Sequence, residues 1–129
     1  MARLVKKSAP EEPDFLPNTR RAAAFADDKK AVNIRAYDVR GLTLIADSFV
    51  VCTATSEPHL KAVYGAISAG MHEVGVRTLH SEGSQSSNWL VLDFGNIIVH
   101  VFRQEAREYY DLDGLWGDAP QIDLGLETK

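Results

Sequence analysis

The stretch Trp89–Phe102, with the sequence Trp-Leu-Val-Leu-Asp-Phe-Gly-Asn-Ile-Ile-Val-His-Val-Phe, contains two apolar runs on either side of Gly95-Asn96. Gly and Asn both tolerate positive φ, so this stretch predicts two antiparallel strands joined by a two-residue hairpin turn. Because side chains alternate between the faces of a strand, that pairing places six apolar residues on one face. We expect this face to contact the core through Leu90, Leu92, Phe94, Ile97, Val99 and Val101.

The opposite face of the predicted hairpin mixes aromatic, aliphatic, acidic and imidazole side chains. In the same register it contains three cross-strand pairs, Trp89 with Phe102, Val91 with His100, and Asp93 with Ile98. Three interpretations are open. A helix covers this face and its polar groups are hydrogen-bonded inside; the turn has an odd number of residues, which would change the register; or the face binds a partner through aromatic anchors. Taken alone, these residues favour the first two interpretations over the third.

The chain of 129 residues is long enough for one domain with a substantial core. Cys52 is the one cysteine, which excludes an intrachain disulfide and is consistent with a reducing compartment. Its apolar neighbours predict a buried and unreactive thiol. No apolar run reaches membrane-spanning length and no signal peptide is recognisable, so the cytoplasm is the expected location.

Charge is unevenly distributed along the chain. Residues 1–30 contain seven Lys/Arg and five Asp/Glu, whereas residues 31–129 contain seven and thirteen, so the net charges are +2 and −6, which add to the −4 of the whole chain. An acidic body is poorly suited to binding phosphate groups, so direct nucleic-acid binding is not expected. A basic protein partner fits this charge better.

The remaining pattern predicts one domain over residues 18–116 between two arms. Residues 1–17 contain three prolines and few large apolar residues, which indicates a disordered arm, and residues 117–129 are predicted to form a loose tail. The expected elements are helices at 18–30, 57–75 and 104–110, strands at 32–39, 47–54 and 76–80, a polar loop at 82–87, and the hairpin. Leu112, Leu115 and Trp116 are expected to fold back onto the body. This order predicts an α/β (α+β) domain with a five-stranded mixed β-sheet packed with helices.

Signatures of catalysis and metal binding are absent from the sequence. The histidines, at positions 59, 72, 80 and 100, show no metal-ligand spacing, and neither a Gly-x-Ser-x-Gly motif nor a phosphate-binding Gly-rich loop occurs. One enzymatic alternative stays open, a nucleotidyltransferase-like enzyme acting on a nucleotide, because Gly83-Ser84 precedes the hairpin. Two-metal chemistry requires clustered carboxylates, however, and Asp93 is the one acid on the hairpin strands. We therefore expect no catalytic residues, no metal site and no cofactor.

A series of motifs runs in order through residues 20–116. It comprises Asp38-Val39-Arg40-Gly41-Leu42, Ile45-Ala46-Asp47-Ser48-Phe49-Val50-Val51, Ala54-Thr55-Ser56, His59, Glu82-Gly83, Trp89-Leu90-Val91-Leu92-Asp93-Phe94-Gly95, Val99-His100-Val101-Phe102, Tyr110-Asp111-Leu112 and Leu115-Trp116. Together these motifs resemble the ribosomal silencing factor family (RsfS), also called the Iojap or YbeB-like family. Ala54 replaces the usual Gly, Pro58 the usual Arg and Asn96 the usual Asp, and the two terminal arms lie outside the pattern.

This resemblance implies a nucleotidyltransferase-like fold without the catalytic acids, and a regulator in place of an enzyme. It further implies binding to the large ribosomal subunit through its basic subunit-interface protein, the fourteenth of that subunit. Such binding would block joining to the small subunit and repress translation when nutrients are scarce. A homodimer of the free protein is implied as well. The resemblance favours a binding role for the mixed hairpin face, and the expected partner-binding residues are Glu82, Trp89, Val91, Asp93, Phe94, Ile98, His100 and Phe102.

Overall fold

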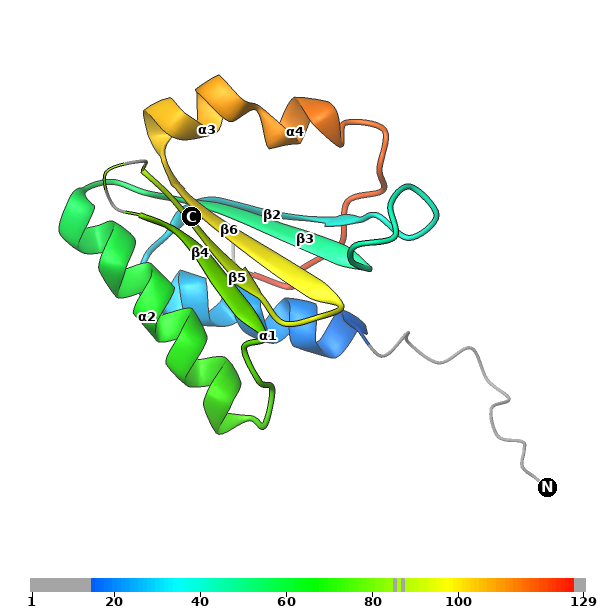
Figure 1. Ribbon diagram of the computed structural model, residues 1–129, viewed down its shortest axis with the longest axis horizontal. Helices are drawn as coiled ribbons and strands as arrows, with labels where there is room; N and C mark the ends of the chain where they lie inside the picture. Colours follow the sequence, from blue (N-terminus) through cyan, green and yellow to red (C-terminus); the bar gives the residue numbers. More distant parts are fainter. Residues whose placement is uncertain (1–14, 85, 87, 127–129) are drawn as a thin grey trace.

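A β-sheet with helices on both faces forms the body of the protein, as the computed structural model shows (Figure 1). The structure describes residues 15–84, 86 and 88–126. One face of the sheet carries the two longer helices, α1 (Phe15–Asp28) and α2 (Glu57–Glu73). The other face carries α3 (Gln104–Tyr110) and α4 (Leu112–Leu115).

The sheet has five strands, and one neighbouring pair is parallel. The strands are β2 (Val32–Asp38), β3 (Ser48–Ala54), β4 (His80–Ser84), β5 (Trp89–Asp93) and β6 (Ile97–Arg103). Their order across the sheet is β2-β3-β6-β5-β4. β3 and β6 run parallel, and the other neighbours run antiparallel. The expected five-stranded mixed sheet of the α+β class is confirmed.

The central hairpin of β5 and β6 has the predicted register. Its mixed face pairs Trp89 with Phe102, Val91 with His100, and Asp93 with Ile98. The N–H of Phe94 donates to the carbonyl of Ile97 at 2.9 Å and closes the turn, and Gly95 has the positive φ, +99°, that the turn requires. A turn with an odd number of residues is therefore excluded.

Two hydrophobic clusters, one on each face of the sheet, hold the helices in place. The first joins α1 and α2 to the apolar hairpin face, as predicted, and includes Phe15, Leu60, Ile67, Met71, Leu92, Ile97 and Val99. The second joins α3 and α4 to the mixed face and includes Tyr37, Phe49, Val51, Ile98, Phe102 and Ala106. Both faces of the hairpin therefore contribute to a core.

The sequence signals at the start of α2 act as predicted. Ser56 caps the helix, because its hydroxyl accepts the N–H of His59 at 3.1 Å, and Pro58 occupies the first turn, where a missing N–H is tolerated. Leu60 and Val63 begin the buried side of the helix. The helix ends at Glu73, slightly before the predicted end.

Helix α1 begins earlier than the sequence pattern predicted. It starts at Phe15, so the domain boundary at residue 18 was placed too late. The side chain of Phe15 is 2% exposed, and the Arg40 guanidinium lies 4.7 Å from the centre of its ring. This burial adds a helical turn that the Leu16-Pro17 sequence does not signal. The predicted disorder of residues 1–14 lies outside the described residues.

The predicted loose tail is wrong for residues 117–126, which pack along the outer edge of β2. The N–H of Asp38 donates to the carbonyl of Pro120 at 2.8 Å, and the N–H of Ile122 donates to the carbonyl of Ala36 at 2.9 Å. Tyr37 forms an antiparallel bridge with Gln121. These hydrogen bonds pair the N–H and C=O groups that an open edge strand would leave without partners. Because only backbone groups form them, the amino-acid composition does not reveal them.

Strand β4 was also misplaced by the sequence pattern. A strand was predicted at residues 76–80, followed by a polar loop at 82–87, but the strand runs over His80–Ser84. Residues His80, Ser81 and Glu82 are all exposed. An edge strand with a polar sequence shows no alternation of apolar residues, so its pairing with β5 carries no hydropathy signal.

Replacing Gly83 with alanine is expected to destabilise the protein by at least about 2 kcal/mol. Gly83 has a φ of +96°, and a Cβ there would lie 2.1 Å from the Trp89 carbonyl oxygen, in the backbone of the neighbouring strand. Equilibrium urea unfolding would measure the loss. Gly65→Ala is the matched control, because nothing lies within 4 Å of its added Cβ, and it should be neutral or stabilising. Equal stabilities for the two variants would contradict the strain at Gly83.

Candidate partner-binding surface

Helices α3 and α4 cover only part of the mixed hairpin face. On β6 the side chains of Ile98, His100 and Phe102 are buried, with exposed fractions of 9%, 8% and 0%. On β5 Trp89, Val91 and Asp93 are half-buried, and Glu82 on the neighbouring β4 is exposed. The interpretation in which a helix covers this face is therefore correct for the β6 residues. The β5 residues and Glu82 on β4 remain accessible to solvent.

Four of the expected partner-binding residues are thus not surface residues. Ile98, His100 and Phe102 lie beneath the α3–α4 layer, and Phe94 is buried on the opposite face with α1 and α2. These four side chains can support the surface from beneath, but they cannot contact a partner directly. The residues that reach solvent are Glu82, Trp89, Val91 and Asp93.

Trp89 is held in a fixed orientation by its aromatic neighbours. Its ring lies 5.0 Å from that of Phe102 and 4.5 Å from that of Tyr110, measured between centroids. The indole Nε1–H donates to Nδ1 of His100 at 3.1 Å. A pre-oriented aromatic side chain of this kind loses little conformational entropy on binding, which suits an interface anchor.

His100 is neutral and serves to orient Trp89. Burial lowers the pKa of this histidine to about 4, so it carries no charge near neutral pH. Indole N–H can only donate, so Nδ1 must be the acceptor and the imidazole proton is on Nε2. Nε2 has no hydrogen-bond partner among the described residues. The interpretation in which polar groups of this face are hydrogen-bonded inside the protein therefore holds for Nδ1 of His100.

Each of the two acids of the surface is held by one contact. Asp93 accepts the N–H of Gly95 at 2.8 Å, which ties its carboxylate to the hairpin turn. Glu82 lies opposite Val91 in the β4–β5 ladder and pairs with His80 at 2.7 Å. Two carboxylates therefore flank the aliphatic and aromatic side chains of β5.

A buried ion pair holds α3 and α4 on the sheet beside this surface. Arg107 of α3, which is 4% exposed, donates to the carboxylate of Asp113 in α4 at 2.8 and 3.1 Å. It also donates to Thr53 Oγ1 at 2.8 Å and to the Asn33 carbonyl at 2.6 Å. The hydroxyl of Tyr37 donates to the same carboxylate at 2.5 Å. Two helices and two strands are joined through one guanidinium.

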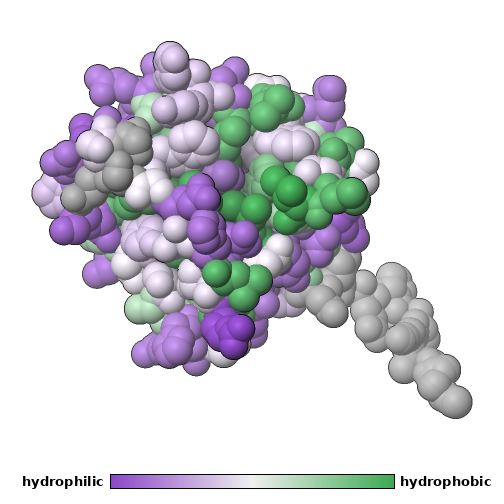
Figure 2. All heavy atoms as spheres, in the orientation of Figure 1, coloured by the Kyte–Doolittle hydropathy of each residue, from purple (hydrophilic) through white to green (hydrophobic). Residues whose placement is uncertain are grey.

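Exposed aliphatic residues extend the apolar surface beyond the predicted set. Leu44 is fully exposed, Ile45 is 63% exposed and Leu42 is 54% exposed, all in the loop between β2 and β3. Leu115 of α4 is 69% exposed. Figure 2 shows hydrophobic side chains gathered on the right of the molecule, where this loop lies in Figure 1. The sequence does not reveal this exposure, because a loop has no periodicity from which exposure can be inferred.

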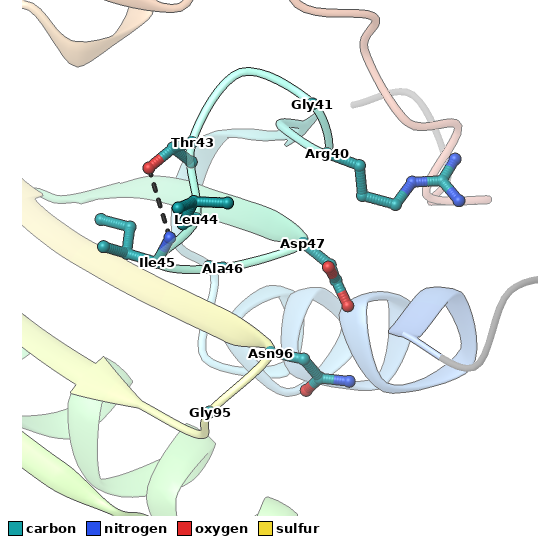
Figure 3. Close-up of a pocket in the computed structure, with 9 residues that line it drawn as sticks. All are labelled: Arg40, Gly41, Thr43, Leu44, Ile45, Ala46, Asp47, Gly95 and Asn96. Atoms are coloured by element: carbon teal, nitrogen blue, oxygen red, sulfur yellow. Dashed lines mark hydrogen bonds between the residues drawn. The ribbon is translucent and has the colours of Figure 1, made fainter.

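The same loop and the hairpin turn line a pocket of about 360 Å³ (Figure 3). A second cavity of about 380 Å³ lies where β3 and β6 end, and Glu105 is the one acid among the described residues that line it. Among the described residues, no group of three or more His, Cys, Asp and Glu side chains could hold a metal ion. The nucleotidyltransferase alternative therefore gains no support from these residues.

None of the described helices is long and apolar enough to cross a membrane.

Comparison with known proteins identifies the family. The family model described as "Ribosomal silencing factor during starvation" (RsfS) matches residues 12–129. The chain belongs to the ribosomal silencing factor family. The resemblance drawn from the motifs is thereby confirmed.

Relatives of known name agree with this membership. The chain is 41% identical over 103 residues to the ribosomal silencing factor RsfS of Bacillus subtilis (strain 168), covering 80% of this chain and 87% of the relative. It is 32% identical over 110 residues to the chloroplastic protein Iojap of Zea mays, covering 83% of this chain and 46% of that protein. The ribosomal silencing factor family thus includes bacterial and chloroplast proteins.

Solved structures confirm the fold. A crystal structure of a Chromobacterium violaceum protein superposes with a TM-score of 0.78 at 28% identity, covering 89% of this chain and 95% of that one. A Bacillus halodurans protein superposes with a TM-score of 0.70 at 32% identity, covering 81% and 94%. The five-stranded mixed sheet is therefore shared with experimental structures.

Proposed function

We propose that this ribosomal silencing factor binds the large ribosomal subunit and sterically blocks its joining to the small subunit, which represses translation. The observation that carries the proposal is the uncovered strip of β5 and β4, where Trp89 and Val91 lie between the carboxylates of Asp93 and Glu82. An aromatic anchor with an acidic border is suited to a basic protein surface. The role is stoichiometric and requires no chemistry.

The partner on the subunit is proposed to be its basic subunit-interface protein, the fourteenth of the large subunit. Residues 31–129 contain seven Lys/Arg and thirteen Asp/Glu, so the body that carries the surface has a net charge of −6. Opposite charges accelerate encounter and align the two surfaces before the apolar groups make contact. Direct contact with ribosomal RNA is not required for this binding.

Two further parts of the proposal concern the oligomeric state and the compartment. The free protein is proposed to form a homodimer, since an apolar strip of this kind can also be covered by a second copy. The compartment is proposed to be the cytoplasm, where the ribosomes of a bacterial relative such as that of Bacillus subtilis are found. The Zea mays relative is named as chloroplastic, so the compartment follows the ribosome that is served.

The proposal predicts complete inhibition of subunit joining at about one copy per large subunit. Purified subunits are mixed with increasing amounts of the protein, and joined ribosomes are followed by light scattering. Inhibition should reach its plateau near equimolar protein once concentrations exceed the dissociation constant. It should be absent when the subunits join before the protein is added, because the surface it needs is then covered.

Two results would contradict this mechanism in different ways. Normal joining in the presence of saturating, demonstrably bound protein would exclude steric blocking while leaving the binding intact. Inhibition by a small fraction of one copy per subunit would indicate turnover and favour an enzymatic role. Co-sedimentation with each separated subunit serves as the control for binding.

A further inference from the structure

The pocket between the β2–β3 loop and the hairpin turn lies outside the strip of β5 and β4 that carries the proposed function. Its walls are formed at the start of β3 and β6, where Asp47 and Asn96 lie side by side (Figure 3). The N–H of Asp47 donates to the carbonyl of Asn96 at 2.8 Å, so the two walls are joined through their backbones. The lining residues are Arg40, Gly41, Thr43, Leu44, Ile45, Ala46, Asp47, Gly95 and Asn96.

The carboxylate of Asp47 makes no close ion pair with a described residue in this pocket, although it attracts Arg40 electrostatically over a longer distance. The residue is half-buried, and its side chain forms no hydrogen bond or ion pair with any described residue. The cation in the lining, Arg40, is already paired, because it donates to both oxygens of Asp38 at 2.9 and 2.7 Å. Figure 3 shows the Arg40 side chain extending away from Asp47. An incoming cation would therefore meet a carboxylate that makes no direct hydrogen bond or ion pair with a described residue.

The rim of the pocket is aliphatic. Leu44 is fully exposed and Ile45 is 63% exposed, and Figure 3 shows both side chains extending from the loop above the start of β3. Large aliphatic groups gain free energy when a complex removes their apolar area from water. The Leu44 side chain is fully exposed in the free protein, so a partner can bury all of its apolar area.

We propose that this pocket receives a lysine or arginine side chain of the protein partner. The aliphatic stem of either residue would pack on Leu44 and Ile45, and its cationic end would reach Asp47 and the exposed Asn96 side chain. No other side-chain type combines an apolar stem with a positive charge. The proposal rests on the proposed function, because it specifies one contact within the same complex.

The pocket and the β5 strip are close enough to be covered by one partner. They are connected by the hairpin turn, since Gly95 lines the pocket and also donates its N–H to Asp93. Trp89 lies six residues before Gly95, which corresponds to about 20 Å along a strand. A standard interface buries about 800 Å² on each partner and spans such a distance.

The test compares substitutions in the pocket with a matched substitution outside it, using purified large subunits as the binding partner. Asp47→Asn keeps the shape and should weaken binding about three- to tenfold, with a weaker dependence on salt. Asp47→Lys should weaken it further, by at least tenfold, because two cations would then face each other. Leu44→Ala should weaken binding roughly tenfold without changing the melting temperature. Asp28→Asn makes the same charge change on the exposed end of α1 and should have no effect.

The outcomes separate this proposal from the function on which it rests. If the parent and Asp47→Lys bind equally while Trp89→Ala binds weakly, the pocket proposal is overturned and the proposed function stands. If Asp28→Asn weakens binding as much as Asp47→Asn, the effect is one of net charge and the pocket proposal is again overturned. If the parent does not bind large subunits, both proposals fall.

Discussion

Replacing Arg107 with alanine is expected to lower the free energy of unfolding by about 3–5 kcal/mol. The guanidinium is buried and joins α3, α4, β2 and β3 through its bonds to Asp113, Thr53 and Asn33. Alanine would leave the carboxylate of Asp113 with only the Tyr37 hydroxyl among these donors and with only the longer-range attraction of Arg35. A half-buried carboxylate that loses its paired cation is strongly unfavourable. The α3–α4 layer should therefore loosen from the sheet.

Urea unfolding of matched variants would measure this effect. Arg103→Ala is the control, because Arg103 is half-buried but its side chain forms no hydrogen bond with a described residue, and its loss should be within about 0.5 kcal/mol. Arg107→Lys should recover only part of the stability, since an ammonium group cannot reproduce the planar fork of donors. Similar losses for Arg103→Ala and Arg107→Ala would refute the central role of the ion pair.

The hydrogen-bond network around Asp113 also makes the stability of the fold depend on pH in the acidic range. Burial alone would raise the pKa of Asp113, but hydrogen bonds from Arg107 and Tyr37 outweigh it and hold this pKa below its ordinary value. A carboxyl with a lowered pKa stabilises the fold at neutral pH, and this contribution is lost as the pH falls through the lowered value. Arg107→Ala should remove that part of the acid dependence. The part due to His100, whose pKa falls from 6.5 to about 4, should be kept, because protonation favours the unfolded chain between these values.

Replacing Trp89 with alanine is expected to weaken binding to the large subunit by about 2–4 kcal/mol, which is roughly thirty- to a thousandfold in the dissociation constant. The indole is pre-oriented by Phe102, Tyr110 and His100 and lies at the uncovered edge of the hairpin. The variant also loses these internal contacts, so binding must be measured at a temperature where circular dichroism shows it to be folded.

Two further variants separate binding from packing at this position. Trp89→Phe keeps an aromatic ring for stacking and removes the Nε1–H donor, so it should bind better than Trp89→Ala. Val74→Ala removes an exposed apolar side chain at the end of α2, on the other face of the sheet, and should bind like the parent. If folded Trp89→Ala binds as tightly as the parent, the strip on β5 is not the contact surface.

The features that the sequence predicted well are those with a local cause. The Gly95-Asn96 turn determines the hairpin register, and alternation then assigns Trp89 and Asp93 to one face. That face was correctly separated from the apolar one, but its division into buried β6 and accessible β5 depends on where α3 and α4 pack. Burial of His100 and Phe102 is therefore a property of tertiary structure that alternation cannot supply.

The features that were missed depend on backbone geometry or on loops. Strand β4 is polar because it lies at an edge, and the segment beside β2 is held by backbone bonds that any sequence can make. The exposed Leu44 and Ile45 carry no signal in a single sequence, because an apolar residue in a loop is as readily buried as exposed.

The segment that closes the edge of β2 has a consequence for how the protein folds during synthesis. β2 is among the first elements to leave the ribosome, whereas its outer partners at Pro120 and Ile122 follow more than 80 residues later. The complete sheet can form once Arg103 has emerged, and its first strand then presents unpaired backbone groups to solvent until the chain has grown further. The nascent polypeptide therefore passes through a stage in which the sheet is assembled and one edge is still open to other chains, and the arrival of residues 120–122 ends that stage.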